Sequence, residues 1–90
     1  MNNQKKIIFM GTAQFAIPCI DNIKKNNFNL IAVVTSPDKP AGRGLKISES
    51  PVKEYAKKNQ LNLLQPVNLK DSNFINQIRR LKPDLIVVVA

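Results

Sequence analysis

The sequence predicts an α/β fold in which parallel strands form a doubly wound sheet. Two observations carry this prediction. Short runs of β-branched residues occur without polar alternation, as is typical of parallel strands covered on both faces. Amphipathic helical patterns separate these runs and supply the crossover connections that parallel strands need. The predicted element order is β-α-β-loop-α-β-α-β.

Four segments are predicted to be strands. Lys6–Met10, Leu30–Val34 and Leu85–Ala90 are continuous apolar runs, and Asn62–Gln65 is a shorter run that Pro66 ends. The run at 85–90 has no turn or helix after it, so one sheet edge and part of one face would be bare. We therefore expect either the front part of a longer domain or a sheet that something else completes. The bare edge also leaves strand-edge self-association open.

Three helices are predicted between the strands. Pro18 fits within the first turn of the first helix, where a proline is tolerated. Ser50-Pro51 is a cap followed by proline and begins the second helix, and Asp71 or Ser72 caps the third. The apolar residues that share a face are Ala16, Ile17, Ile20 and Ile23 in the first helix, Val52, Tyr55 and Ala56 in the second, and Phe74, Ile75, Ile78 and Leu81 in the third.

The composition limits the chemistry. The formal net charge of +8 favours an anionic partner such as nucleic acid, although scattered lysines can also serve only to keep a chain soluble. There is no histidine, which excludes imidazole general-base chemistry in this chain. The single cysteine, Cys19, excludes an internal disulfide and is interpreted as a small buried apolar residue. No metal site is predicted.

No targeting or membrane segment is recognisable in the sequence. The N-terminus lacks the apolar stretch of a secretory signal. No apolar run approaches the roughly 18 residues of a membrane span. We therefore expect a cytoplasmic protein with no membrane partner.

The connection Ser36–Lys46 is the most informative segment. It is longer than the roughly 2–6 residues that usually join a strand to a helix. Its basic and glycine residues are Lys39, Gly42, Arg43, Gly44 and Lys46. An arginine can bridge two phosphate oxygens with its planar fork or stack on a base. The segment is interpreted as an arm that binds an anion, RNA being the best fit, and the alternative is a solvated loop without a partner.

A second candidate site follows the first predicted strand. Gly11 and Thr12 stand at the carboxyl end of that strand, where open α/β sheets bind ligands. Phe15 lies one turn further and either lines a small apolar pocket or packs in the core. The dinucleotide fingerprint and the phosphate-loop motif are both absent, so a nucleotide-binding half is disfavoured and a purely structural turn is the alternative.

Blocks along the whole chain resemble the methionyl-tRNA formyltransferases. They appear in that family's order and spacing at 7–12, 15–16, Pro37–Gly44, Ser50–Lys53, Leu64–Pro66 and Lys82–Ala90. The specific block is Pro-Asp-Lys-Pro-Ala-Gly-Arg-Gly at 37–44, an insertion that related formyltransferases acting on sugar nucleotides, or fused to folate dehydrogenases, do not share.

The resemblance implies a Rossmann-like formyltransferase fold and a one-carbon transferase of translation initiation. Its members transfer a formyl group from 10-formyltetrahydrofolate to the methionyl amine of initiator tRNA. The family's insertion loop enters the acceptor-stem region, which makes Arg43 the leading candidate for tRNA contact. The implied tRNA-binding loop is Lys39, Gly42, Arg43, Gly44 and Lys46, and the implied substrate-proximal turn is Gly11, Thr12 and Phe15.

The resemblance also places the catalytic machinery outside this chain. In the family, the Asn-x-His motif, a later Asp, most of the folate pocket and a C-terminal tRNA-binding β-barrel all follow the strand that matches Leu85–Ala90. We therefore expect residues 1–90 to be the N-terminal part of a catalytic domain, with no catalytic residue and no turnover alone. The alternatives are a non-catalytic RNA-binding fragment and another folate-dependent formyltransferase.

The chain departs from the family pattern at a few positions. Ala13 and Gln14 replace a proline and an acidic residue of the family, and Leu45 replaces a basic residue. The first change is expected to alter local rigidity only. The loss of one cation predicts somewhat weaker attraction to tRNA.

Overall fold

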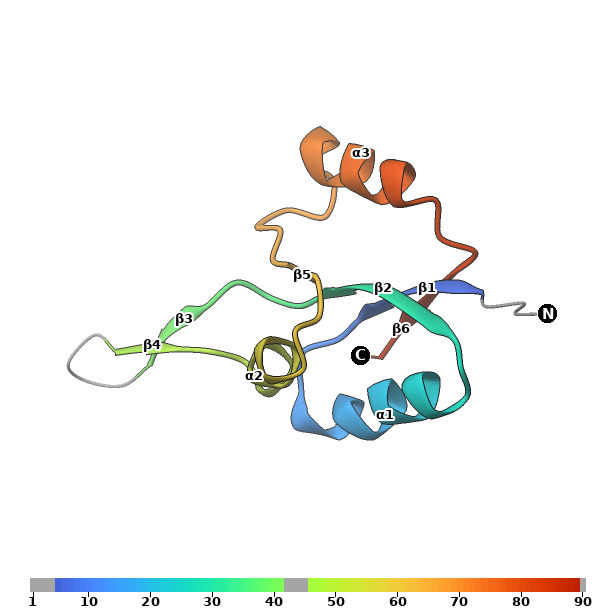
Figure 1. Ribbon diagram of the computed structural model, residues 1–90. Coiled ribbons are helices and arrows are strands. Elements are labelled where there is room, and N and C mark those ends of the chain that lie inside the picture. The colour runs from blue at the N-terminus through green and yellow to red at the C-terminus, as the bar shows by residue number, and fades with distance from the viewer. Residues whose placement is uncertain (1–4, 42–45, 90) are drawn as a thin grey trace.

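A parallel sheet forms the centre of the molecule (Figure 1). The computed structural model describes residues 5–41 and 46–89, and for residues 39–41 and 46–48 it describes the backbone alone. The sheet has four strands in the order β5-β2-β1-β6, and every pairing is parallel. Their bounds are Lys6–Met10 for β1, Asn29–Val34 for β2, Leu63–Leu64 for β5 and Leu85–Val88 for β6. The predicted α/β class is confirmed.

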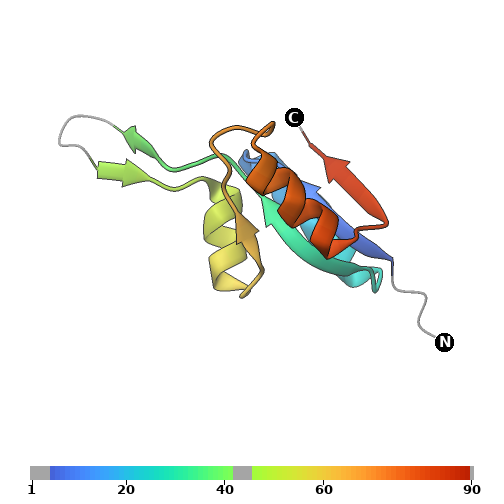
Figure 2. The same ribbon diagram turned by 90° about the horizontal axis from the view of Figure 1, so that it is seen from above.

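Helices cover both faces of this sheet. The helix α1 (Ile17–Lys25), preceded by the short 3₁₀ turn η1 (Gln14–Ala16), lies with α2 (Pro51–Lys58) on one face. The helix α3 (Ser72–Leu81) lies on the other face (Figure 1). Figure 2 shows α3, in orange, crossing over the central strands. The predicted helices are therefore all present.

Local signals explain where the helices begin and end. The Ser50 hydroxyl accepts a hydrogen bond from Lys53 N at 3.0 Å, as an N-cap side chain does. Asp71, and not Ser72, caps α3 by accepting from Asn73 N at 3.0 Å. The helix α3 ends at Leu81, and its C-cap residue Lys82 adopts a left-handed backbone with φ 50° immediately before a proline.

Two apolar clusters hold the helices on the sheet. The cluster under α1 and α2 consists of Ile7, Phe9, Ala16, Ile20, Ile23, Val33, Val52 and Ala56. The cluster under α3 consists of Ile8, Ala32, Val34 and Phe74. Successive residues of β1 enter opposite clusters, as the pleat of a strand buried on both faces requires. The sequence placed Ile75 on the apolar face of α3, but Ile75 is exposed because that face is narrower than predicted.

The long connection contains two strands that the sequence did not predict. The strands β3 (Lys39–Ala41) and β4 (Lys46–Ser48) form an antiparallel ribbon that pairs Lys39 with Ser48 and Ala41 with Lys46. The fixed φ of Pro40 is compatible with a short edge strand. We call residues 39–48 the arm. Its strands β3 and β4 project away from the rest of the molecule (Figures 1 and 2).

The strand β6 forms one edge of the sheet. Within residues 5–41 and 46–89, β6 pairs with β1 and with no other strand. Its residues Leu85, Ile86 and Val88 are exposed although they are apolar, as the sequence predicted for a bare edge. Self-association through this edge stays a prediction.

Candidate functional site

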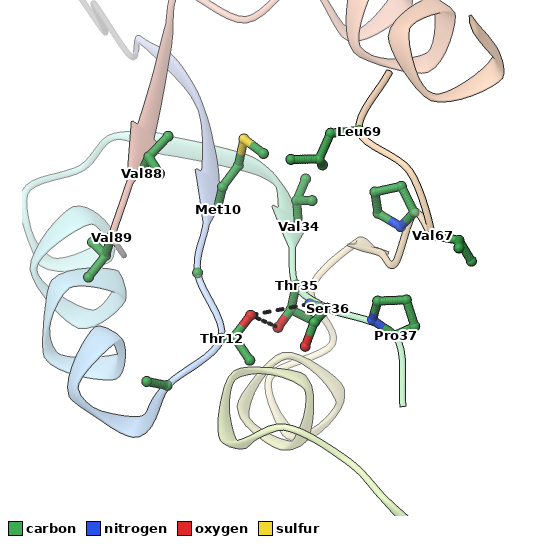
Figure 3. A pocket seen from close by; sticks show the side chains of 13 residues that line it. Met10, Thr12, Val34, Thr35, Ser36, Pro37, Val67, Leu69, Val88 and Val89 are labelled. Atoms are coloured by element: carbon green, nitrogen blue, oxygen red, sulfur yellow. Dashed lines mark hydrogen bonds between the residues drawn. The ribbon is translucent and has the colours of Figure 1, made fainter. Parts of the chain in front are cut away.

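The carboxyl ends of β1, β2 and β6 open into a pocket of about 500 Å³ (Figure 3). Met10, Val34 and Val88 line it from the strand ends, and Val67 and Leu69 line it from the loop that follows β5. Ligands of open α/β sheets bind at this edge because loops and helix starts converge there. The pocket is therefore the candidate site for an apolar group of a ligand.

Hydroxyl groups form the polar side of this pocket. The Thr35 hydroxyl donates to Thr12 Oγ1 at 3.2 Å and is hydrogen-bonded to Ser50 Oγ at 3.0 Å. Ser36 N donates to Thr12 Oγ1 at 3.3 Å, and Figure 3 shows Thr12, Thr35 and Ser36 meeting at the pocket. Because Thr35 is buried, this network fixes the loops after β1 and β2 against the start of α2.

Gly11 has a packing role at the mouth of the pocket. A Cβ built on Gly11 would lie 2.8 Å from Phe9 Cε2 and 3.3 Å from Ala16 Cβ. Phe9 and Ala16 are fully buried, so neither can move aside cheaply. Gly11 N also donates to Val34 O at 2.9 Å, continuing the sheet pairing past β1. Close packing accounts for a glycine at this position.

The structure brings together part of the predicted substrate-proximal turn. Gly11 and Thr12 line the pocket, together with Ala13. Phe15, in η1, is 63% exposed and is not among the lining residues of the pocket. Phe15 thus lies neither in the core nor in the pocket wall. A small apolar pocket was one of the two expectations for Phe15, but the residues that line the observed pocket from β2, β6 and the loop after β5 were not predicted. The last apolar residue of each predicted strand was a usable signal for them.

Charged residues gather where the arm joins the body. Lys53 Nζ donates to Asp38 Oδ2 at 2.6 Å and lies 3.2 Å from Glu49 Oε2. Gln65 Nε2 donates to Asp38 Oδ1 at 3.0 Å. Lys57 Nζ donates to both oxygens of Glu49, at 3.2 and 3.0 Å. We call Asp38, Glu49, Lys53, Lys57 and Gln65 the arm-base network.

The contacts of this network shift the pKa values of its members. Hydrogen bonds from Lys53 and Gln65 lower the pKa of Asp38 below its ordinary 3.8. Hydrogen bonds from Lys57 and Lys53 lower the pKa of Glu49 below its ordinary 4.5. The hydrogen bond to Asp38 raises the pKa of Lys53 above its ordinary 10.5. All three groups are therefore charged near neutral pH, and Lys53 attracts both carboxylates.

The predicted tRNA-binding residues all belong to the arm. The backbone of Lys39 begins β3 at the base of the arm, and that of Lys46 begins β4, where it pairs with Ala41. Gly42, Arg43 and Gly44 lie outside the described residues, as does Leu45. The arm-base network was not predicted, because its partners are distant in sequence and carry no shared local pattern.

The described part of the chain lacks two kinds of feature. Residues 5–41 and 46–89 contain no group of three or more His, Cys, Asp and Glu residues that could hold a metal ion. None of the helices in these ranges has the length and apolarity needed to cross a membrane.

Comparison with known proteins identifies the family. A family profile described as "Formyl transferase" matches residues 5–90. The chain belongs to the formyl transferase family. The four parallel strands and the helices on both faces are consistent with the Rossmann-like fold of this family.

Curated relatives of this formyl transferase chain bear the name methionyl-tRNA formyltransferase. The chain is 54% identical over 85 residues to the protein of that name from Flavobacterium johnsoniae and 52% identical over 85 residues to the one from Clostridioides difficile. Each alignment covers 94% of the chain, and the relative from Legionella pneumophila is 44% identical over 98% of the chain. The chain spans 27–28% of the length of these relatives.

Proposed function

We propose that this chain forms the N-terminal part of the catalytic domain of a methionyl-tRNA formyltransferase. The activity of such an enzyme would be transfer of a formyl group to the methionyl amine of initiator tRNA during translation initiation, in the cytoplasm. Identity of 54% to the Flavobacterium johnsoniae protein over nearly the whole chain is the single observation that carries this proposal. No residue of this chain is assigned a catalytic role.

The pocket at the strand ends supports a substrate-binding role. Its apolar lining fits an aliphatic group such as the methionyl side chain, since apolar pockets with few polar groups bind ligands of this kind. Thr12, Thr35 and Ser36 supply hydroxyls at its polar side. We assign Gly11, Thr12 and Phe15 to the substrate-proximal turn, with Phe15 exposed and available to a ligand.

The arm supports a role in tRNA binding. Its strands β3 and β4 project from the body, and its sequence contains Lys39, Arg43 and Lys46. The formal net charge of +8 favours association with a polyanion. We propose that Arg43 contacts a phosphate or base of initiator tRNA, with Lys39 and Lys46 adding charge and Gly42 and Gly44 adding backbone freedom.

The formyl donor is proposed to be folate-based, and specifically 10-formyltetrahydrofolate. Membership of the formyl transferase family supports a folate-type donor in general, and the specific compound is our proposal. The chain's own contribution would be to bind and orient the aminoacyl end of the tRNA. Formyl transfer would form a bond between the formyl carbon and the neutral methionyl amine and break the bond between that carbon and N10 of the folate. One proton would move from the amine to N10, which releases tetrahydrofolate.

A chimera tests the proposal. Residues 5–89 would replace the matching segment of the Flavobacterium johnsoniae relative, and the purified chimera would be assayed with 10-formyltetrahydrofolate and methionyl-tRNA. We expect formylation with a KM for tRNA that rises with salt, because phosphate contacts release counterions. The 90-residue chain alone is expected to bind tRNA without formylating it.

Matched variants make the test specific. Arg43→Ala should raise the KM for tRNA. It should also reduce the dependence of tRNA affinity on salt by the amount expected for the loss of about one phosphate contact. Arg79→Ala removes the same charge from an exposed position on α3 and should leave the KM unchanged. A folded chimera that ignores tRNA and formylates a sugar or a free metabolite would contradict the proposal.

A further inference from the structure

One lysine joins the two ends of the arm. Asp38 stands immediately before β3 and Glu49 immediately after β4. Lys53 Nζ, from the first half of α2, lies 2.6 Å from Asp38 Oδ2 and 3.2 Å from Glu49 Oε2. The side chain of Lys53 is only 13% exposed, while those of Asp38 and Glu49 are 27% and 29% exposed. Lys53 therefore bridges both chain segments at the point where they leave the body.

Further contacts fix each carboxylate from a second direction. Gln65 Nε2 donates to Asp38 Oδ1 at 3.0 Å and to Ser36 O at 3.1 Å, so the loop after β5 holds the first segment. Lys57 Nζ lies 3.0 Å from Glu49 Oε2, so α2 holds the second segment at two points. Each carboxylate of the arm base thus accepts from more than one donor, which restricts its orientation as well as its distance from Lys53 Nζ.

The arm needs such a restraint because it is small. A two-stranded hairpin alone is marginally stable in water, and β3 and β4 have three residues each. Isolated exposed ion pairs contribute little to the free energy of unfolding. A partly buried network that joins two chain segments also restricts how those segments lie relative to each other. Without Lys53, Asp38 and Glu49 would also present poorly compensated negative charge beside the arm.

We propose that Lys53 is a positioning residue for RNA binding: it bridges Asp38 and Glu49 and thereby sets the direction in which the arm leaves the body. Lys53 acts through the two carboxylates and does not contact the RNA itself. This inference rests on the proposed function, in which the arm binds initiator tRNA. Lys53 at the arm base would thus control the affinity for initiator tRNA by joining the chain segments that contain Asp38 and Glu49.

Binding measurements on the 90-residue chain test this role. Labelled initiator tRNA would be titrated with the parent chain and with Lys53→Met, Lys53→Arg and Lys58→Met, using fluorescence anisotropy at two salt concentrations. Lys53→Met should weaken binding about threefold to tenfold, since the bridge contributes through two ion pairs. Lys53→Arg keeps both carboxylates paired and should restore binding to within about twofold of the parent.

The variant Lys58→Met is the matched control for charge. Lys58 is exposed on the same helix, so its replacement removes one positive charge without touching the arm-base network. We expect it to change the affinity by less than about twofold. An equal loss of affinity in Lys53→Met and Lys58→Met would overturn the inference, because net charge alone would then explain both.

Remaining outcomes separate this inference from the proposed function. Salt-independent or undetectable binding by the parent chain would refute the tRNA-binding role and the positioning role with it. Parent-like binding by a folded Lys53→Met variant would refute the positioning role alone. Circular dichroism reports whether each variant folds. If Lys53→Met is unfolded, the same binding titration with Asp38→Asn and Glu49→Gln tests the bridge instead. Weaker binding by both supports the bridge, and parent-like binding by either one overturns it.

Discussion

The backbone of Gly11 lies directly against the ring of Phe9. A Cβ at position 11 would lie 2.8 Å from Phe9 Cε2, whereas carbon atoms in favourable contact are about 3.5–4.0 Å apart. Gly11→Ala is therefore predicted to lower the free energy of unfolding by about 1–3 kcal/mol, the usual cost of overpacking. Denaturant-induced unfolding followed by circular dichroism measures this change.

The Phe9→Leu background provides the control for this prediction. Leucine lacks the ring atoms that a Cβ at position 11 would meet, so Gly11→Ala should cost less in that background. A double-mutant cycle measures the difference. The same cost in both backgrounds would show that the Phe9 ring is not the cause.

Thr35 is predicted to stabilise the pocket through its hydroxyl. The hydroxyl bonds to Thr12 and Ser50, and Thr35 is buried. Thr35→Val retains the shape but removes both hydrogen bonds, so the free energy of unfolding should fall by about 0.5–1.5 kcal/mol. Thr12→Val is the comparison. Thr12 is exposed, so loss of its hydroxyl should lower the free energy of unfolding by less. A larger cost at Thr12 would contradict this ranking.

The elements of the body could be predicted from local sequence, because their signals are local. Apolar runs, Pro18 and the Ser50-Pro51 cap each act within a few residues, and the structure confirms the strands and helices that they predict. The arm was predicted as a loop because β3 contains a proline and glycines follow it. Its antiparallel pairing joins residues of two separate strands, and the pattern within a single strand does not reveal its partner.

The candidate site was less predictable than the fold. Asp38 stands immediately before β3. Its ion pair with Lys53 joins positions 15 residues apart, and no periodicity links them. Phe15 was assigned either to the core or to a pocket wall, yet it is exposed. Exposure depends on how η1 meets the sheet, and that is a property of tertiary packing.

Tyr55 is predicted to ionise unusually late. Burial and a hydrogen bond donated to Asp21 raise the pKa of Tyr55 from 10.0 to about 12. Tyr55 is the only tyrosine and the chain has no tryptophan, so the ultraviolet absorbance of the phenolate reports this group alone. Asp21→Asn removes the negative charge and should lower the midpoint of the titration. An unchanged midpoint would contradict the role of Asp21.

The same shift makes stability depend on alkaline pH. Because the pKa of Tyr55 is higher in the folded chain than its ordinary 10.0, the unfolded chain releases its proton first as pH rises. The contribution of Tyr55 is therefore complete below pH 10.0 and is lost as pH rises toward about 12. Tyr55→Phe should remove this part of the pH dependence in denaturant unfolding.

Acid pH is predicted to weaken the arm-base network. The pKa values of Asp38 and Glu49 are lowered from 3.8 and 4.5, so the unfolded chain binds protons more readily than the folded chain. Their stabilisation is complete above pH 4.5 and is lost as pH falls through the lowered values. Lys53→Met should reduce this acid dependence, which denaturant unfolding at a series of pH values measures. A steeper dependence in that variant would contradict the assignment.

Phe15 is predicted to matter for a ligand and not for stability. It is 63% exposed, and surface substitutions usually change the free energy of unfolding by less than about 0.5 kcal/mol. Phe9 is fully buried, so Phe9→Ala should lower the free energy of unfolding by about 3–5 kcal/mol. If Phe15 belongs to the substrate-proximal turn, Phe15→Ala in the chimera should lower kcat/KM for methionyl-tRNA while the melting temperature stays constant. Parent-like kcat/KM in this folded variant would instead assign Phe15 to the solvent-exposed surface, because a side chain that meets the substrate cannot be removed without a kinetic effect.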